Sequence, residues 1–559
     1  MAKTKHLFLI ILFAGLLSGS AKLYAQSRFP GMYLISFTDK NNSPYSVNKP
    51  EQFLSGRAIL RRQAASVAIS VQDFPPNPFY IDSITKYDAR PLFSSRWLNA
   101  VLVRMDDSLK LEQIKLLAFV DSTAYLAPVK SAAKKKKSKK RTKAVNTGVQ
   151  EQATALDYGA SRTQLELIGI TDLHRQGFLG EEVQIAVLDN GFIGMKKMSV
   201  FNDFFDNGQL LGTKDFANPG GDVFKEGSHG TYVMSMMAAF EEGVLCGSAP
   251  GASYWLLVTE DGSYEYPIEE FNWLAGAEFA DSAGADVITS SLIYSTFDDT
   301  TLSHTHAQLD GKTAIVSRAA QIAAEKGILV FNSAGNDARN DWHKIGFPAD
   351  AKDIITVGAV NMDGVYAGFS STGYTADGRV KPDVAAVGEK AKSVSISTGK
   401  IIEINGTSFS NPTVAGAAAV LLQANKDKSL PDIRNAIRQS ASHADYPDSL
   451  TGYGIPDFYM AHLLLNNKQI DAIKQEDGFT LFPNPAHDDV YVLLYLNDSQ
   501  LVDISIVDVG GKTVWEQTQV QFSKGLNRYR LKNLNALTQG VYIVVLQFGD
   551  KTRTEKLIR

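Results

Sequence analysis

Four side chains in this 559-residue sequence have the types that peptide-bond cleavage by a hydroxyl group requires. Ser408 offers a nucleophile, and His229 offers a base that takes its proton. Asp189 offers a carboxylate that orients the base, and Asn336 offers an amide that donates to the developing oxyanion. Each residue alone has a commoner structural role, in a turn, a core, a helix cap or a loop. Only their combination favours catalysis.

The sequence around each candidate predicts how it is positioned. Asp189 ends the apolar run 183–188 and precedes a tight Asn-Gly turn, whereas Asn336 follows the apolar run 328–331. His229 stands directly before the apolar stretch 232–240, which predicts the first turn of a buried helix, and Gly230 after it allows close approach of another backbone. Ser408 precedes a small-residue helix predicted over 413–422. A nucleophile at a helix N-terminus lies near free backbone N–H groups.

Short apolar strands alternate with helices through the middle of the chain. The predicted strands are 183–189, 255–258, 287–289, 328–331 and 354–360, and the helices between them include 268–283 and 315–326. This alternation predicts parallel βαβ units and an α/β domain. Ligands of such sheets collect at the carboxyl ends of the strands, where Asp189 stands.

Smaller units flank the α/β domain. Residues 31–128 mix strands at 32–37 and 97–103 with a helix at 52–63, which predicts a small α+β unit. From 478 onward, alternating runs at 490–494, 502–507, 528–531 and 540–546 predict a compact β-sandwich. The expected organisation is a signal peptide (1–25), an α+β domain (26–130), a basic linker (131–150), a catalytic domain (151–465), a linker (466–477) and a sandwich (478–559).

The N-terminal segment predicts export. Lys3 and Lys5 precede the apolar run 7–17, and Ala25 offers a cleavage position after small residues. The run is shorter than the roughly 20 residues that span a bilayer, so we expect a signal peptide and no transmembrane segment.

Charge is distributed unevenly along the chain. Residues 1–150 hold 24 Lys and Arg against 9 Asp and Glu, whereas the remainder holds 32 against 51. Attraction between the two parts is therefore expected. The Lys- and Arg-rich run 134–143 is either an exposed processing site or a charged spacer. No aromatic residues interleave it, so nucleic acid is not an expected partner.

Neither cysteine nor histidine spacing indicates a metal centre. Cys246 is the only cysteine, which excludes an intrachain disulfide and favours a buried, inert thiol. His304 and His306 stand in a polar segment that favours a loop over a zinc site. We expect no cofactor for catalysis. Structural calcium is left open, although no ligand loop for it is legible.

At Asp189, His229, Asn336 and Ser408 the chain resembles the subtilases, the subtilisin-like serine peptidases. The resemblance spans 158–458, and the order Asp, His, Ser agrees with it. It implies a parallel sheet of about seven strands flanked by helices, and hydrolysis of protein or peptide substrates through an acyl-enzyme.

The resemblance also implies substrate contacts. Ser291 and Leu292 would pair with an extended substrate backbone, and Ala334 and Gly335 would form part of the wall of the primary specificity pocket. Ile293 departs from the family pattern, in which glycine is usual. This departure puts the substrate specificity in doubt, but not the type of reaction. Other departures are Asn190, Met234 and the pair Phe409-Ser410.

Both flanking units carry resemblances of their own. The 31–128 unit resembles the propeptides that chaperone and inhibit subtilases, which implies an intramolecular inhibitor. The segment 482–486, the turn 507–512 and the chain end 556–559 resemble the C-terminal sorting domain of type IX secretion. This implies Sec export, the type IX secretion machinery as partner, and an extracellular or cell-surface location. An ordinary accessory sandwich that binds carbohydrate or protein is the alternative.

The expected function is that of a secreted serine endopeptidase. A catalytically silent surface adhesion or binding protein on a peptidase fold is the alternative from another class. An esterase or lipase is disfavoured, because Ser408 lacks the Gly-x-Ser-x-Gly elbow and the order of the three residues differs.

Overall fold

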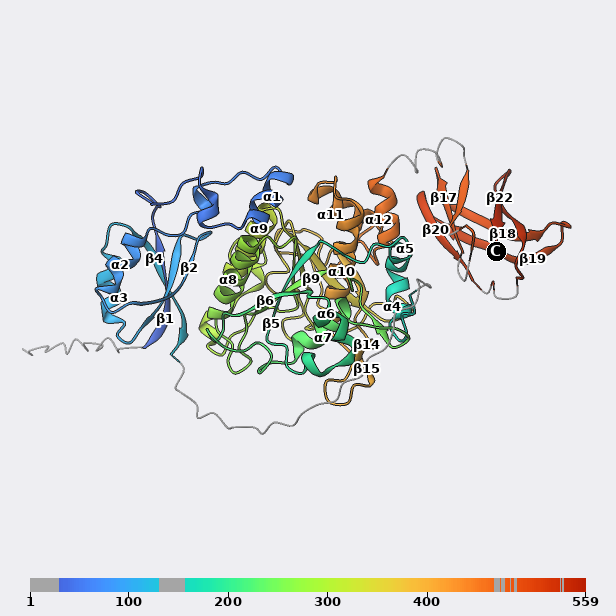
Figure 1. Ribbon diagram of the computed structural model, residues 1–559. Coiled ribbons are helices and arrows are strands. Elements are labelled where there is room, and N and C mark those ends of the chain that lie inside the picture. The colour runs from blue at the N-terminus through green and yellow to red at the C-terminus, as the bar shows by residue number, and fades with distance from the viewer. Residues whose placement is uncertain are drawn as a thin grey trace, which may run out of the picture.

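A computed structural model describes residues 30–129, 156–466, 473, 478–482, 484–486, 490–532, 534 and 537–559. The predicted signal peptide 1–25, the basic linker 131–150 and nearly all of the predicted linker 466–477 lie outside these residues. Three units follow one another in chain order across Figure 1, from blue through green and orange to red. In the described ranges, no helix combines the length and apolarity needed to cross a membrane.

The central unit is built on a seven-stranded parallel sheet, as predicted. Its order is β13-β12-β11-β10-β5-β9-β6. The strands are β5 (Gln184–Asp189), β6 (Leu210–Asp215), β9 (Ser253–Val258), β10 (Val287–Ser290), β11 (Leu329–Ser333), β12 (Ile355–Val360) and β13 (Val384–Val387). The five inner strands were predicted, whereas the edge strands β6 and β13 were not.

Helices cover both faces of this sheet. Ile185 and Val187 of β5 face the core beneath α7 (His229–Met237) and α10 (Thr407–Ala424). Ala186 and Leu188 face the core beneath α8 (Ile268–Ala283) and α9 (Ile315–Glu325). Burial on both faces explains why these strands read as continuous apolar runs. The remaining elements of this unit are α4 (Arg162–Leu167), α5 (Ile170–Arg175), α6 (Asn202–Asp206), α11 (Leu430–Gln439), α12 (Phe458–Leu465), β7 (Phe240–Glu241), β8 (Leu245–Cys246), β14 (Ala391–Val394) and β15 (Ile401–Ile404).

The N-terminal unit is an antiparallel sheet of order β2-β3-β1-β4 with three helices. Its elements are β1 (Gly31–Phe37), α1 (Gly56–Ala64), α2 (Pro78–Thr85), β2 (Arg90–Ser95), β3 (Ala100–Met105), α3 (Leu109–Lys115) and β4 (Val120–Pro128). Residues such as Ile35 and Val101 form a core of their own, whereas Leu34 and Leu102 join the core around α8. The unit therefore packs through one sheet face against α8, as Figure 1 shows.

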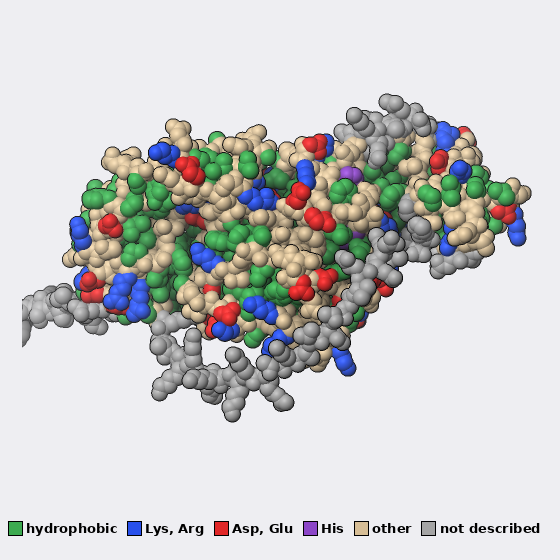
Figure 2. Space-filling view, viewed as in Figure 1, with side chains coloured by type: hydrophobic (Ala, Val, Ile, Leu, Met, Phe, Trp, Pro, Cys, Tyr) green, Lys and Arg blue, Asp and Glu red, His purple; other side chains and the backbone are tan. Residues whose placement is uncertain are grey.

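Buried ion pairs reinforce this contact. Arg62 is fully buried and lies 3.0 Å from Asp73 Oδ1 and 2.6 Å from Asp281 Oδ2. Arg61 and Arg96 also reach Asp281, at 2.6 and 3.1 Å. On the face shown in Figure 2, by contrast, charges of both signs are interspersed over these two units. The expected attraction thus concentrates at the buried contact with α8.

The C-terminal unit consists of two antiparallel sheets around one core, which is the predicted sandwich. Its strands are β16 (Phe479–Phe482), β17 (Val490–Leu496), β18 (Gln500–Asp508), β19 (Thr513–Phe522), β20 (Gly525–Leu531), β21 (Val541–Phe548) and β22 (Lys551–Ile558). Arg528 of β20 forms ion pairs with Asp172 and, at 2.6 Å, with Asp457 of the central unit. Arg530 lies 2.9 Å from Glu166.

Candidate active site

Asp189 and His229 form a hydrogen-bonded pair at the carboxyl edge of the sheet. Asp189 is the fully buried last residue of β5, and His229 is the first residue of α7. The imidazole Nδ1 lies 2.9 and 3.0 Å from the two carboxylate oxygens. Because a carboxylate only accepts, Nδ1 carries the proton and Nε2 is left to act as a base.

Close backbone packing fixes this pair. A Cβ added to Gly230 would lie 2.6 Å from the Gly191 carbonyl, so the approach predicted for Gly230 is confirmed. Gly191 itself has φ of 140°, and a Cβ there would lie 1.8 Å from the Glu226 carbonyl. Neither position tolerates a side chain without movement, so the turn after Asp189 and the start of α7 are held together.

Electrostatics favour the protonated imidazole. Burial lowers the pKa of His229, but the Asp189 carboxylate, with help from Glu260, outweighs burial and raises the pKa above its ordinary value. Glu260 follows β9, the strand beside β5, and lines a cavity of about 270 Å³ together with Asn190, Asp215, Asp222, Glu226 and Asp261. Five carboxyl side chains therefore line the cavity that Glu260 borders.

Ser408 is the second residue of α10, so the helix starts earlier than the predicted residue 413. Pro412 therefore stands inside the helix and leaves the Ser408 carbonyl without its helical donor. Ser291 Oγ replaces that donor at 3.0 Å.

The start of α10 approaches His229 through Phe409, the residue after Ser408. The ring of Phe409 has its centroid 5.9 Å from that of His229. Ser408 Oγ donates to the Ser291 carbonyl at 3.4 Å, and no hydrogen bond joins it to His229, both being residues the structure describes. Hydrogen bonds between nucleophile and base are often long or absent before substrate binds.

Asn336 is oriented by Thr407. Asn336 Oδ1 accepts from the backbone N–H of Thr407 at 2.9 Å and from its Oγ1 at 3.1 Å. This leaves Nδ2 beside Gly406, where an added Cβ would lie 3.7 Å from it. An amide donor thus faces the start of α10, next to Ser408.

The predicted substrate contacts lie side by side. Ser291 and Leu292 follow β10, and Ala334 and Gly335 follow the neighbouring β11. A Cβ on Gly335, whose φ is 107°, would lie 2.8 Å from Ile293 Cδ1. Ile293 therefore occupies the space between the two segments.

Other sequence candidates do not join this site. His304 Nε2 pairs with Glu270, whereas His306 Nε2 donates to the Trp342 carbonyl. Cys246 is buried, and burial raises the pKa of its thiol to about 12. The thiol is therefore protonated and inert at neutral pH.

Sequence reasoning missed two residues that position the site. Thr407 stands in the motif around Ser408, but its contact with Asn336 spans 71 positions of sequence. Asn411 Nδ2 donates to Thr289 Oγ1 and to the Ser290 carbonyl, both at 3.0 Å, which anchors α10 to β10. The position of Asn411 three residues after Ser408, one helical turn on, was the available signal.

Comparison with known proteins agrees with this geometry. The profile of the Subtilase family matches residues 180–454, which contain Asp189, His229, Asn336 and Ser408. The chain is 30% identical over 299 residues to Subtilisin E of Bacillus subtilis (strain 168), covering 52% of this chain and 68% of that protein. The chain belongs to the subtilase family. Subtilisin of Bacillus pumilus is 29% identical to this subtilase, with 52% and 93% covered.

The flanking units of this subtilase match separate families. Residues 32–144 match the Peptidase S8 propeptide domain of Bacteroidota. Residues 480–559 match the Secretion system C-terminal sorting domain. The chain is therefore a subtilase with a propeptide and a sorting domain of type IX secretion, and the sorting domain indicates export to the cell surface or beyond.

Solved structures share the fold of this subtilase. Fervidolysin from Fervidobacterium pennivorans, described as a keratinolytic enzyme related to subtilisin, is 20% identical with a TM-score of 0.51, covering 94% of this chain and 72% of that one. The epidermin leader peptide processing serine protease of Staphylococcus aureus is 16% identical with a TM-score of 0.52, covering 79% and 99%.

Proposed function

We propose that this subtilase is a secreted endopeptidase that cleaves proteins through an acyl-enzyme on Ser408. The proposal rests chiefly on the Asp189–His229 pair at the carboxyl edge of a parallel sheet, against which Phe409, the residue after Ser408, packs. Family membership supports the reaction class, and the residues present supply each group that it needs.

The proposed reaction uses each side chain at one atom. His229 Nε2 takes the proton of Ser408 Oγ as Oγ attacks the scissile carbonyl, and Asp189 stabilises the imidazolium. Asn336 Nδ2 and the Ser408 backbone N–H donate to the oxyanion. His229 then gives its proton to the leaving amine, and a water molecule hydrolyses the ester by the same route in reverse.

Ser291 and Leu292 are proposed to pair with the substrate backbone, and Ala334 and Gly335 to border the side chain before the scissile bond. The Ser291 carbonyl accepts from Ser408 Oγ in the free enzyme, so Oγ would leave it when it turns toward His229. No cofactor enters this mechanism.

Casein hydrolysis and labelling by a serine-directed phosphonate test the proposal. The wild-type chain, after removal of the N-terminal unit, should do both. Ser408→Ala should not be labelled and should lose about 10⁶-fold in kcat, the loss measured for a subtilisin. Cleavage and labelling that persist in Ser408→Ala would refute the assignment. An inactive wild-type protein would support the adhesion alternative, and activity on esters alone would support an esterase.

The N-terminal unit is proposed to inhibit the enzyme until it is cut away near the basic linker 131–150. Its buried ion pairs with Asp281 support tight docking. A purified 31–128 fragment should inhibit the mature enzyme, and Asp281→Ala in the enzyme should weaken inhibition. Arg90→Ala is the matched control, because Arg90 is exposed and pairs only within its own unit. No inhibition by a folded fragment would contradict the proposal.

The export route is proposed from the same flanking units. The predicted signal peptide would direct Sec export, and the sorting domain would direct passage across the outer membrane through the type IX machinery. Deletion of 478–559 should leave the protein inside the outer membrane, as cell fractionation would show. Unchanged delivery to the medium would indicate an ordinary accessory sandwich instead.

A further inference from the structure

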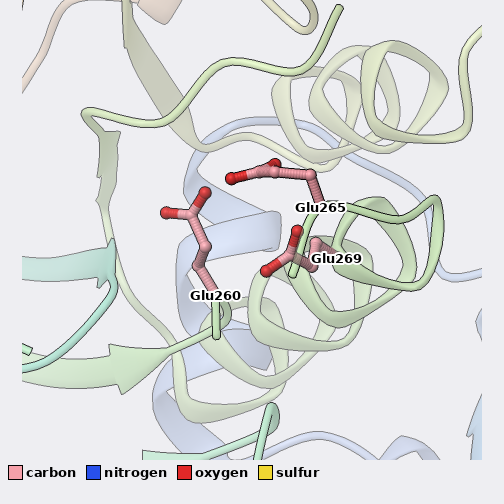
Figure 3. A group of neighbouring side chains, drawn as sticks. All are labelled: Glu260, Glu265 and Glu269. Atoms are coloured by element: carbon pink, nitrogen blue, oxygen red, sulfur yellow. The ribbon is translucent and has the colours of Figure 1, made fainter. Parts of the chain in front are cut away.

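Three glutamate side chains converge beside the proposed active site. Glu260 follows β9, Glu265 lies in the loop between β9 and α8, and Glu269 lies in the first turn of α8. One carboxylate oxygen from each lies within 4.8 Å of the others. Figure 3 shows the three side chains directed toward a common point. We call them the glutamate triad.

One oxygen at the floor of the triad has no partner. Glu269 is fully buried, and its Oε1 accepts from the Asp261 N–H at 2.8 Å, whereas its Oε2 accepts no hydrogen bond. The next residue, Glu270, is equally buried but fully satisfied, by His304 Nε2 at 2.5 Å and the Val316 N–H at 3.1 Å. A buried carboxylate oxygen without a partner is costly, so this contrast points to a missing ligand at Glu269.

The triad also lacks a counter-charge. No Lys, Arg or His in the described part of the chain forms an ion pair with Glu260, Glu265 or Glu269. Three carboxylates at this separation stay charged together only if a cation joins them.

The triad is positioned before any ligand binds. Two hydrogen bonds join the Glu265 backbone to Asp298. The Glu265 N–H donates to the Asp298 carboxylate at 3.2 Å, and the Asp298 N–H donates to the Glu265 carbonyl at 2.9 Å. The Glu269 N–H donates to the Tyr266 carbonyl at 3.0 Å. Glu265 is exposed, Glu260 is half-buried and Glu269 is buried, so an ion has a route from solvent to the floor. Water can supply the remaining ligands.

We propose that Glu260, Glu265 and Glu269 bind one divalent cation, with Ca²⁺ preferred over Mg²⁺. Carboxylate oxygens are hard ligands, and Ca²⁺ accepts six to eight of them in flexible geometry, whereas Mg²⁺ demands a near-ideal octahedron. The ion would tie the loop after β9 to the start of α8. It performs no step of peptide hydrolysis, and it neutralises charge close to His229.

Calcium titration of the full-length Ser408→Ala variant tests the site without dependence on peptidase activity. Calorimetry should find one Ca²⁺ site, and Ca²⁺ should raise Tm more than Mg²⁺ does. Glu265→Gln should weaken the affinity about tenfold or more, since a ligand is lost. Glu242→Gln is the matched control, because Glu242 is an exposed glutamate outside the triad and should leave binding unchanged.

A second variant separates ligand loss from misfolding. Glu269→Gln keeps the side-chain shape and an oxygen that accepts from the Asp261 N–H, so its Tm without Ca²⁺ should equal that of the parent, while the Ca²⁺-dependent rise disappears. The proposal is overturned if Ca²⁺ produces neither heat nor a Tm shift, or if Glu265→Gln binds Ca²⁺ as Glu242→Gln does. It is also overturned if Glu265→Gln only weakens cleavage of lysine-containing peptides, which would make the triad a substrate subsite.

Discussion

Ser291 Oγ donates a hydrogen bond to the backbone carbonyl of Ser408, the group that Pro412 leaves without a helical donor. This contact permits α10 to start before Pro412, and it couples the end of β10 to the nucleophile. Ser291→Ala should leave a buried carbonyl unsatisfied, destabilising the protein by about 1–3 kcal/mol.

The same substitution should lower kcat, because the start of α10 would lose an anchor. Urea unfolding in the Ser408→Ala background measures the stability, and kcat is measured on a peptide substrate. Ser303→Ala is the control, since Ser303 lies in a loop and its hydroxyl accepts from the Phe297 N–H, away from α10. Equal effects of both substitutions would contradict the anchoring role of Ser291.

Thr407 gives a prediction about the oxyanion donor. Thr407→Val keeps the side-chain shape but removes the hydroxyl that donates to Asn336 Oδ1 and accepts from the Gly335 N–H. We expect kcat to fall about tenfold with KM nearly unchanged, because the backbone N–H of Thr407 still holds Asn336.

The kcat of Asn336→Ala should fall further, by about 10²- to 10³-fold, which is the range measured for one oxyanion donor of a subtilisin. Thr407→Ser keeps the hydroxyl and should restore most of the loss. A Thr407→Ser variant as slow as Thr407→Val would show that the methyl group, and not the hydrogen bond, is what matters.

The pH dependence follows from the raised pKa of His229. The base must be neutral, so activity should be lost as pH falls through a value above about 6.5, the ordinary pKa of histidine. Profiles of kcat/KM against pH measure this loss of activity on the acidic side.

Asp189→Asn should move the His229 pKa below its ordinary value, because burial then acts without the carboxylate. NMR titration of the imidazole in the Ser408→Ala background measures the pKa directly. An unchanged pKa in Asp189→Asn would show that the pair in the structure does not control the base.

A second histidine predicts acid sensitivity of the fold. His174 is fully buried, accepts from the Tyr158 hydroxyl at Nδ1 and donates to the Ser248 carbonyl from Nε2, at 3.2 and 3.1 Å. Burial lowers its pKa from 6.5 to about 4. The unfolded chain therefore binds a proton at a higher pH than the native protein does, and stability should fall as pH drops from about 6.5 to 4.

His174→Gln should flatten this dependence while costing some stability at pH 7. Unfolding curves at several pH values in the Ser408→Ala background report both effects. His443→Gln serves as the control, because His443 is partly exposed. A wild-type stability that stays constant between pH 6.5 and 4 would contradict the prediction.

Ile293 predicts a restricted substrate cleft. Its Cδ1 fills the space in front of Gly335, between the two segments proposed to contact substrate. Ile293→Gly should raise kcat/KM for peptides with large side chains before the scissile bond, relative to small ones. Gly335→Ala should lower kcat/KM for all peptides, because φ of 107° and a 2.8 Å contact exclude its Cβ. Product analysis of a peptide library measures both, and an unchanged library profile in Ile293→Gly would remove Ile293 from the cleft.

The sequence predicted those parts of the protein that local pattern determines. The five inner strands, α8 and the start of α7 could be read because both faces of the sheet are buried and His229 precedes an apolar run. The edge strand β6 could not be predicted, because half of Leu210–Asp215 is polar. It is a strand because it pairs with β9. Thr407 and the glutamate triad were missed because their contacts depend on strand order and long-range packing.

The buried ion pairs between Arg62 and Asp281 bear on the timing of activation. Cutting the linker would break one covalent connection but leave those charges paired in a site shielded from solvent. Separation would expose Arg62 and Asp281 and remove the pairing that now offsets the cost of their burial. If the N-terminal unit inhibits as proposed, cleavage and release are distinct events, and release is the one that activates the peptidase.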